Sequence, residues 1–188
     1  MQGQLDSALD ELGVEQSQTN GRLLAGFGID ALYASPLERA RQSAEIINRR
    51  LNLSVRYDAR IKEWDCGDWS GYLYEEVQTR WAAEWAALQA DRFHYRGPNC
   101  ENYPDMIERA APFLREAMAE PARSIAIVSH GVIGRVMVAI LLGLDESATL
   151  AFRQPNEVLY RVTLDAGRAS VDHYVAGAGP FPGLVPRD

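Results

Sequence analysis

Hydrophobic and polar positions alternate along this chain in two recurring patterns. Apolar residues at helical spacing predict five helices, at about residues 9–26, 36–51, 72–90, 104–119 and 132–142. Between them, short runs rich in apolar residues predict strands at about residues 31–34, 54–57, 125–129, 159–164 and 170–174. Such alternation is typical of the α/β class with a largely parallel sheet. The turn signal at 165–167 predicts a terminal hairpin, which would make one edge of the sheet antiparallel.

The pattern runs from residue 1 to about residue 176 without an internal repeat or a linker, which predicts a single domain. Residues 177–188 are rich in Gly and Pro and predict an irregular C-terminal tail. Trp81 and Trp85 lie four residues apart on one predicted helix. We interpret them as core packing and not as a platform for stacking bases.

Charge and composition narrow the classes of partner. The 188 residues carry a net charge of −7 with a pI near 5.0, which argues against nucleic acid or an acidic membrane as the partner. The longest apolar stretch, residues 132–144, is interrupted by Arg135 and is too short to span a bilayer, and no signal peptide opens the chain. Cys66 and Cys100 show no metal-ligand spacing and no disulfide framework, so we expect a cytoplasmic protein without a metal.

The most informative segment is Ser124-Ile-Ala-Ile-Val-Ser129-His130-Gly131, where a buried strand is predicted to end and a helix to begin. Ligand sites in open parallel sheets lie at such carboxyl ends. Gly131 permits a tight turn, and the first amides of the helix could hold an anion beside the His130 imidazole. Taken alone, a histidine that only satisfies its hydrogen bonds near a helix N-terminus is the better interpretation.

A second segment, Ser35-Pro-Leu-Glu-Arg39, predicts a helix start. Ser35 as N-cap, Pro36 at the first helical position and Glu38 three residues after the cap form a capping box. Arg39 in the first turn opposes the helix dipole, and a bound anion would remove that conflict. The alternative is an arginine that reaches solvent or pairs with a neighbouring glutamate.

A third segment, from Arg60 to Gly71, places carboxylates between large aromatic residues in a loop punctuated by glycines. A carboxylate walled by indole rings is partly desolvated, which favours its neutral form and suits general acid catalysis. Glu63 is the candidate acid. The alternative is a solvated acidic loop in which Asp65 and Asp68 only form turns.

Together these segments closely resemble the histidine phosphatase superfamily, also called the phosphoglycerate mutase-like family. The resemblance covers nearly the whole chain and rests on four blocks in order: Leu9-x-Glu-Leu-Gly13, Ser35-Pro-Leu-x-Arg-Ala-Arg-Gln-x-Ala-Glu45, Glu63-x-x-x-Gly-Asp-Trp-x-Gly71 and Ser129-His-Gly131. It implies a three-layer α/β sandwich of the phosphoglycerate mutase-like type. It also implies that Arg39 binds phosphate, that Glu63 protonates the leaving group and that His130 contacts the transferring phosphoryl group. Glu101 matches more loosely a glutamate beside the pocket.

The sequence departs from the family in one respect. The family opens with a strand that ends in Arg-His-Gly, whose histidine is the nucleophile, and no such motif occurs here. Residues 1–7 instead resemble the loop that follows the motif. His94 and His173 lie in no matching context, so we do not expect either of them to replace the nucleophile.

Two explanations of this departure remain open. In the first, the sequence starts at an internal methionine of a longer enzyme. In the second, the chain is an inactive phosphatase-like protein that binds a phosphorylated ligand. The first is preferred because a sheet without its central strand would leave backbone groups unpaired.

The resemblance implies phosphoryl transfer through a phosphohistidine, without metal or other cofactor, on a small phosphorylated substrate. A phosphatase is expected over a phosphoglycerate mutase, because residues 73–99 form mostly a Trp/Ala helix with scattered Arg80, Arg92 and Arg96. The identity of the substrate and the oligomeric state, a homodimer included, stay open.

Overall fold

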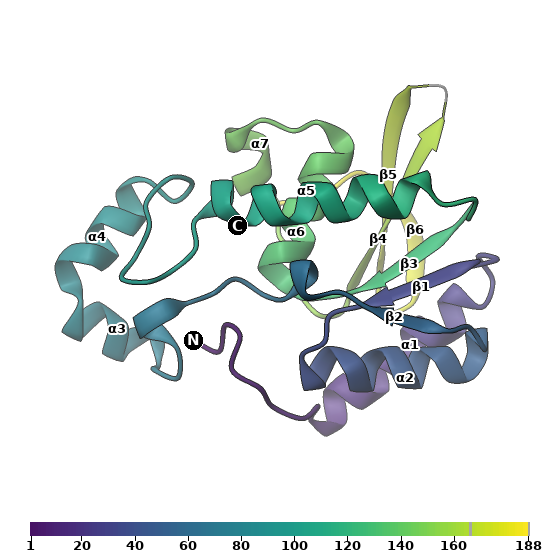
Figure 1. The fold of residues 1–188 in the computed structure, drawn as a ribbon, viewed down its shortest axis with the longest axis horizontal. Coiled ribbons are helices and arrows are strands. Elements are labelled where there is room, and N and C mark those ends of the chain that lie inside the picture. Colours follow the sequence, from purple (N-terminus) through teal and green to yellow (C-terminus); the bar gives the residue numbers. More distant parts are fainter. Residues whose placement is uncertain (166, 188) are drawn as a thin grey trace.

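The computed structural model describes residues 1–165 and 167–187, and it confirms the α/β class. The central element is a parallel sheet of three short strands in the order β2-β1-β3 (Figure 1). Their bounds are Ala31–Ala34 for β1, Val55–Tyr57 for β2 and Ile125–Val128 for β3. The register places Leu32 of β1 opposite Val55 on one side and Ala126 on the other.

Successive residues of β1 point to opposite faces of this sheet, and each face is covered by helices. Leu32 packs in a cluster with residues of α1 (Glu11–Leu24) and α2 (Glu38–Leu51). Tyr33 packs on the other face with α5 (Tyr103–Ala119) and α6 (Gly131–Leu142). The period of two in the strand and the apolar stripes of the helices thus produce the three layers that the family resemblance implies.

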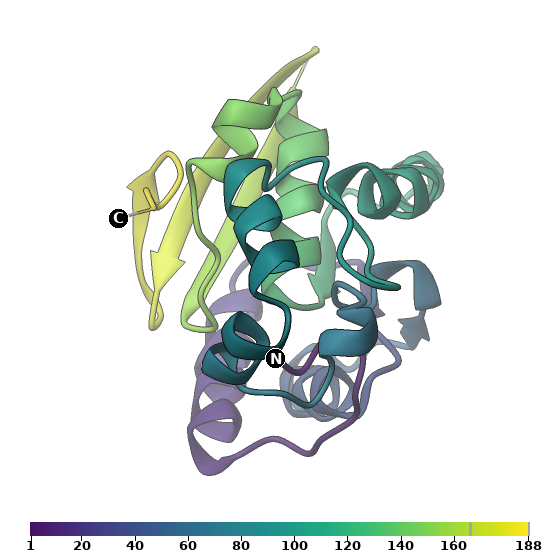
Figure 2. The same cartoon turned by 90° about the vertical axis from the view of Figure 1, so that its left-hand side faces the viewer.

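The antiparallel part of the fold is a second sheet of three strands in the order β4-β5-β6. β4 (Val158–Asp165) and β5 (Arg168–Val175) form the predicted hairpin, although Ala166 of its turn lies outside the described residues. β6 (Ala178–Pro182) falls in the segment predicted to be an irregular tail, so that prediction is wrong for these residues. The short helix α7 (Glu146–Leu150) precedes this sheet. Figure 2 shows α6 between α5 and the second sheet.

The predicted start of the second helix is also wrong. α2 begins at Glu38 with Leu37 as its N-cap, and not at a Ser35 capping box. The amide of Ser35 still belongs to the sheet, since it donates to the carbonyl of Val128 over 2.9 Å, and its hydroxyl accepts from the amide of Leu37. Tertiary pairing therefore delays the helix by two residues.

The helix predicted over residues 72–90 is two helices, α3 (Tyr74–Arg80) and α4 (Ala82–Ala90). They meet at Trp81, whose φ of −124° and ψ of 49° are not helical. Trp81 and Trp85 both pack against a cluster around Trp69, which fits the predicted role in packing. The loop between β2 and α3 contains the short 3-10 turns η1 (Ala59–Ile61) and η2 (Gly67–Trp69). In the described part of the chain, no helix has the length and apolar character needed to cross a membrane.

Candidate active site

Three of the predicted site residues come together at the carboxyl end of the parallel sheet. His130 directly follows β3 as the N-cap of α6, and Arg39 lies in the first turn of α2, which follows β1. Because β1 and β3 are adjacent and parallel, their carboxyl ends bring these two side chains into contact. The Arg39 Nε atom donates to the His130 Nδ1 atom over 3.2 Å.

This contact fixes the form of the imidazole. Since Nδ1 accepts from Arg39, the ring proton of the neutral imidazole lies on Nε2, which donates to the hydroxyl of Ser35 over 2.8 Å. Burial lowers the pKa of His130 to about 3, and the charges of Arg39 and Arg109 act in the same direction. His130 is therefore a neutral hydrogen-bond donor at neutral pH.

Glu63 lies beside them, and its carboxylate caps the start of α6. One oxygen, Oε1, accepts from the amide of Ile133 over 3.1 Å and from the amide of Trp64 over 2.8 Å. The other, Oε2, accepts from the amide of Val132 over 3.2 Å. We expected the first amides of this helix to hold a bound anion such as phosphate, and in the structure they bind the carboxylate of Glu63 instead. All three of these hydrogen bonds to the Glu63 carboxylate come from backbone amides.

Gly131 serves this site by close approach and not by a left-handed turn, since it is not among the glycines with positive φ. A Cβ atom at this position would lie 3.3 Å from the carbonyl oxygen of Gln154 and 3.9 Å from Glu63 Oε2. A side chain at residue 131 would therefore crowd the groups around the start of α6.

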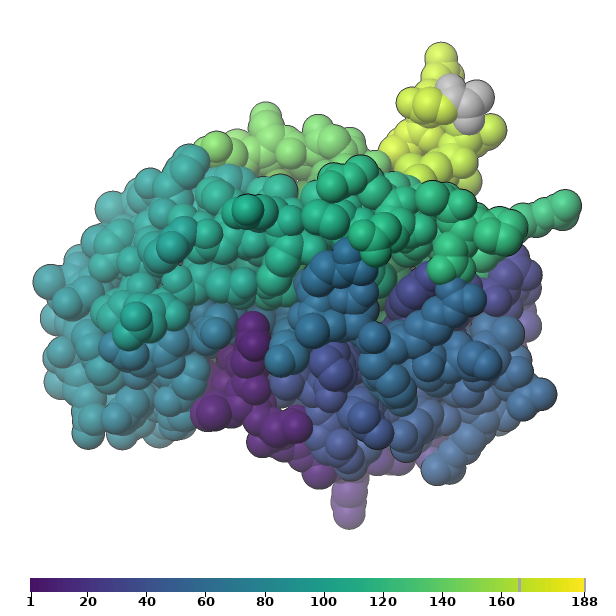
Figure 3. Space-filling model, viewed as in Figure 1, coloured from purple at the N-terminus to yellow at the C-terminus, as the bar shows by residue number. Residues whose placement is uncertain are grey.

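The N-terminal segment covers the guanidinium of Arg39. The Arg39 Nη1 atom donates to the carbonyl oxygen of Leu5 over 2.9 Å, and the Arg39 Nη2 atom donates to the carbonyl oxygen of Gly3 over 2.8 Å. The carboxylate of Asp6 accepts from the amide of Glu38 over 2.6 Å, so the start of α2 is also occupied by an acidic side chain. Figure 3 shows this segment on the surface, between the residues of α2 and those around α3. Burial lowers the pKa of Arg39, against the nearby negative charges of Glu63 and Asp6.

Glu101 does not lie beside Arg39 as a free carboxylate but forms a bidentate ion pair with Arg109 of α5. Its two oxygens accept from Arg109 Nε over 2.6 Å and from Arg109 Nη2 over 2.9 Å. Arg109 also donates to the carbonyl oxygens of Arg60, Lys62 and Glu63. The pair therefore fastens the loop that carries Glu63 onto α5. The sequence analysis missed Arg109, because an arginine on the polar side of an amphipathic helix looks like a solvated residue.

The other histidines lie elsewhere, as expected. His94 is exposed and lies beside Asp91 and Glu146. The His173 Nδ1 atom lies 2.9 Å from the carbonyl oxygen of Gly183, in the second sheet. Both cysteines are free and buried, and no group of three metal-binding side chains occurs in residues 1–165 and 167–187.

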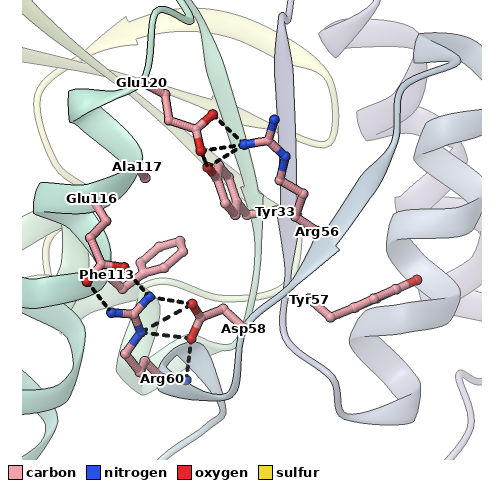
Figure 4. Close-up of a pocket in the computed structure, with 9 residues that line it drawn as sticks. All are labelled: Tyr33, Arg56, Tyr57, Asp58, Arg60, Phe113, Glu116, Ala117 and Glu120. Atoms are coloured by element: carbon pink, nitrogen blue, oxygen red, sulfur yellow. Dashed lines mark hydrogen bonds and ion pairs between the residues drawn. The ribbon is translucent and has the colours of Figure 1, made fainter.

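A separate pocket of about 240 Å³ lies between β1, β2 and α5, and its charges are already paired (Figure 4). Arg56 contacts Glu120, and Arg60 contacts both Asp58 and Glu116. The Tyr33 hydroxyl donates to Glu120 over 2.6 Å. Because both arginines are neutralised by carboxylates, this pocket is poorly suited to bind a phosphate.

Comparisons with known proteins identify the family of this chain. The family model for the histidine phosphatase superfamily (branch 1) matches residues 1–176. Phosphoserine phosphatase 1 of Hydrogenobacter thermophilus is 32% identical over 152 residues, which are 80% of this chain and 72% of that protein. A probable phosphoglycerate mutase of Erwinia tasmaniensis is 32% identical over 163 residues, which are 86% of this chain and 76% of that protein.

Solved structures are similar over almost the whole length. A mycobacterial glucosyl-3-phosphoglycerate phosphatase in complex with inorganic phosphate has a TM-score of 0.83 and 26% identity, with 95% of this chain and 93% of that chain covered. An alpha-ribazole-5'-P phosphatase of Escherichia coli, described as putative, has a TM-score of 0.85 at 24% identity, with 95% and 88% covered, which shows a shared fold.

Proposed function

The chain belongs to the histidine phosphatase superfamily, and from this premise we propose that Arg39, Glu63 and His130 form a site that acts on a small phosphomonoester. The observation that carries the proposal is the direct contact of Arg39 with His130 at the carboxyl end of the sheet, with Glu63 at the start of the same helix as His130. A guanidinium and a neutral imidazole donor can stabilise a transferring phosphoryl group, and a carboxyl group can protonate the leaving oxygen, whereas turnover also needs a nucleophile that these three residues do not supply.

Arg39 and His130 would hold the transferring phosphoryl group. The Nη1 and Nη2 atoms of Arg39 now bind the neutral carbonyl oxygens of Leu5 and Gly3. Phosphate oxygens form stronger, charge-assisted hydrogen bonds with the same two donors, so a bound phosphate would replace those carbonyl groups. The Nε2–H group of His130 donates to the Ser35 hydroxyl in this structure, and it could donate instead to a phosphoryl oxygen.

Glu63 would protonate the leaving oxygen. Three backbone amides hold its carboxyl group in one place, which is the positioning that a general acid needs. Each carboxyl oxygen has two lone pairs, so Oε2 with its single amide donor keeps a position for the proton to be transferred. Arg109 and Glu101 would act indirectly, by holding the loop that carries Glu63.

We favour hydrolysis over mutase activity, although relatives of both kinds are similar to this chain. The stretch 73–99 corresponds to the segment where a mutase would need adjacent basic residues for a second phosphate. It consists largely of α3 and α4, which pack at a cluster of tryptophans, and its arginines Arg80, Arg92 and Arg96 are scattered. We also propose a cytoplasmic location, which the two free cysteines support.

The binding part of the proposal is tested with inorganic phosphate and vanadate, measured by isothermal titration calorimetry on the 188-residue chain. Arg39→Ala removes two charge-assisted donors, so we expect it to weaken phosphate binding by about tenfold or more. Arg41→Ala is the matched control, because Arg41 lies on the same helix with a half-exposed side chain. Equal affinity of the Arg39→Ala variant and the parent would remove Arg39 from the site.

A further inference from the structure

Residues 3–6, which we call the strap, lie across the first turn of α2. This turn presents three hydrogen-bond donors to the strap, which are the amide of Glu38 and the Nη1 and Nη2 atoms of Arg39. Each of the three donors binds an oxygen atom of the strap. The strap therefore fills a site made by two adjacent residues, one of which is the arginine that we propose to bind phosphate.

The oxygen atoms of the strap stand where those of a bound anion would stand. The Asp6 carboxylate accepts from the Glu38 amide over 2.6 Å, at a helix N-terminus where negative charge is favoured. The carbonyl oxygen of Leu5 accepts from Arg39 Nη1 over 2.9 Å, and that of Gly3 accepts from Arg39 Nη2 over 2.8 Å. Phosphate oxygens bind the same two kinds of donor, so phosphate and the strap compete for them.

The strap also contacts the loop that carries Glu63. The Gln4 Nε2 atom donates to the carbonyl oxygen of Glu63 over 3.0 Å. Gly3 lies against Cys66 of the same loop, since a Cβ atom at residue 3 would lie 2.9 Å from the Cys66 Sγ atom. The φ of Gly3 is 54°, in the left-handed region that favours glycine. The strap thus bridges two sides of the candidate site, and its docked position depends on glycine at residue 3.

The strap is held by few buried contacts. Residues 1–9 run as a surface loop ahead of α1, and the side chain of Leu5 is 48% exposed (Figure 3). Loops of this kind open at a low cost in free energy. Two of the three contacts with α2 are made by neutral carbonyl groups, which bind a guanidinium more weakly than phosphate does. Phosphate can therefore displace the strap while the helices and sheets stay intact.

We propose that the strap is an autoinhibitory contact, in which Asp6 acts as an internal anion and Arg39 is closed to phosphate until the strap is released. The inference rests on the proposed function, because it takes Arg39 as a phosphate-binding residue. The measured affinity for phosphate is then the intrinsic affinity reduced by the fraction of molecules in which the strap is released. Weakening the strap should tighten phosphate binding, whereas ordinary damage to a binding site weakens it.

Calorimetry with inorganic phosphate on the 188-residue chain provides the first test. Asp6→Asn removes the charge at the N-terminus of α2 with almost no change of shape, so we expect phosphate to bind about two- to fivefold more tightly. Asp10→Asn is the matched control, because it removes the same charge from the N-cap of α1 and asparagine caps a helix equally well. The affinity of this control should stay close to that of the parent.

Gly3→Ala weakens the strap by a different route, without removing a charge. The left-handed φ and the contact with Cys66 both disfavour a side chain at this residue, so we expect phosphate to bind about fivefold or more tightly. Either gain should require Arg39. In an Arg39→Ala background, Asp6→Asn should therefore bind phosphate no better than Arg39→Ala alone.

Hydrogen exchange reports the position of the strap in the parent chain. Backbone hydrogen bonds hold the segment in place, since the Leu5 amide donates to the carbonyl of Gln2 and the Gly71 amide donates to the carbonyl of Met1. Saturating phosphate should speed exchange in the peptide of residues 1–9, because phosphate releases the strap. Unchanged or slower exchange in this peptide would show that phosphate binds beside a docked strap, which overturns the inference.

The calorimetric outcomes separate the two proposals. If either folded strap variant, Asp6→Asn or Gly3→Ala, binds phosphate no more tightly than Asp10→Asn, autoinhibition is overturned and the proposed function stands. If neither the parent nor the two strap variants bind phosphate, the proposed function is overturned and the inhibitory strap falls with it. Tighter binding by both strap variants that is lost on Arg39→Ala supports both proposals.

Discussion

At the scale of single residues, the buried neutral form of His130 makes the stability of the fold depend on pH. Its pKa falls from 6.5 to about 3 in the folded chain, whereas the unfolded chain takes up a proton near pH 6.5. Between these values the unfolded state binds more protons, so acid favours unfolding. We predict that the contribution of His130 is complete above about pH 6.5 and that roughly 3 kcal/mol of it is lost by pH 4.

Urea denaturation of the parent and of His130→Gln, at pH 7 and pH 4, measures this contribution. Carboxylates contribute to the acid sensitivity of both proteins, so they cancel in the comparison. His130→Gln should start from a lower free energy of unfolding and should lose less of it between the two values of pH. An equal loss in both proteins would contradict the buried neutral imidazole.

At the scale of elements, Arg109 joins the loop that carries Glu63 to α5. Its side chain is 19% exposed, and its partner Glu101 is 20% exposed. Arg109→Met removes five hydrogen bonds and leaves Glu101 without its ion-pair partner. Because breaking a largely buried pair strands the remaining charge, we predict a loss of about 3 to 5 kcal/mol in the free energy of unfolding.

Thermal or urea unfolding checks this loss, with Arg115→Met as the control. Arg115 lies on the same helix and is exposed, so its substitution should change stability by less than about 0.5 kcal/mol. Hydrogen exchange adds a local measurement, since the amides of Val132 and Ile133 bind Glu63 and should exchange faster in Arg109→Met. Similar losses for Arg109→Met and Arg115→Met would show that the loop is held by other contacts.

The sequence predicted those elements whose signals are local. A short apolar run followed by Ser129-His130-Gly131 located β3 and the start of α6, because the strand and its turn are encoded in adjacent residues. The start of α2 was misplaced because the backbone of Ser35 pairs with β3, a contact more than ninety positions away along the chain. The pattern of residues made Glu63 a candidate acid, whereas the resemblance to the family was needed to assign phosphate binding to Arg39.

Arg109 and Arg135 show what the local pattern could and could not reveal. Nothing in the sequence around Arg109 distinguishes it from a solvated arginine, since its partners come from residues 60–63 and from Glu101. Arg135 did leave a signal, because a charged residue interrupts an otherwise apolar helix. In the described residues of the structure, the Nε and Nη1 atoms of Arg135 are buried without a hydrogen-bond partner, which the sequence pattern did not predict.

At the scale of the whole molecule, the edge strands β3 and β4 of the two sheets pack together without strand-to-strand hydrogen bonds in the described residues. In the described ranges, β3 pairs only with β1, and β4 pairs only with β5. Val128 and Leu159 nevertheless pack in one apolar cluster, so the two unpaired edges belong to neighbouring parts of the fold. The carboxyl end of any further strand paired in parallel with β3 would lie beside His130, which is the position that a nucleophile facing the phosphoryl group would occupy.

We therefore predict that the purified 188-residue chain hydrolyses p-nitrophenyl phosphate no faster than background, even where it binds phosphate. Covalent transfer needs a nucleophile in line with the leaving group, and the candidates near Arg39 are poor. Burial raises the pKa of the Cys66 thiol to about 12, and His130 is committed to Arg39 and Ser35. Attack by His130 would also remove a charge-stabilising donor, so the rate should fall by orders of magnitude.

The measurement compares this chain with a version extended at its N-terminus by a strand-forming sequence that ends in Arg-His-Gly. The extended protein should show turnover that is abolished when its added histidine is replaced by alanine, because that histidine would face the phosphoryl group held by Arg39 and His130. His130→Ala in the short chain is the decisive control. Turnover of the short chain comparable to that of the extended one, and abolished by His130→Ala, would make His130 a sufficient nucleophile and would contradict the need for a further one.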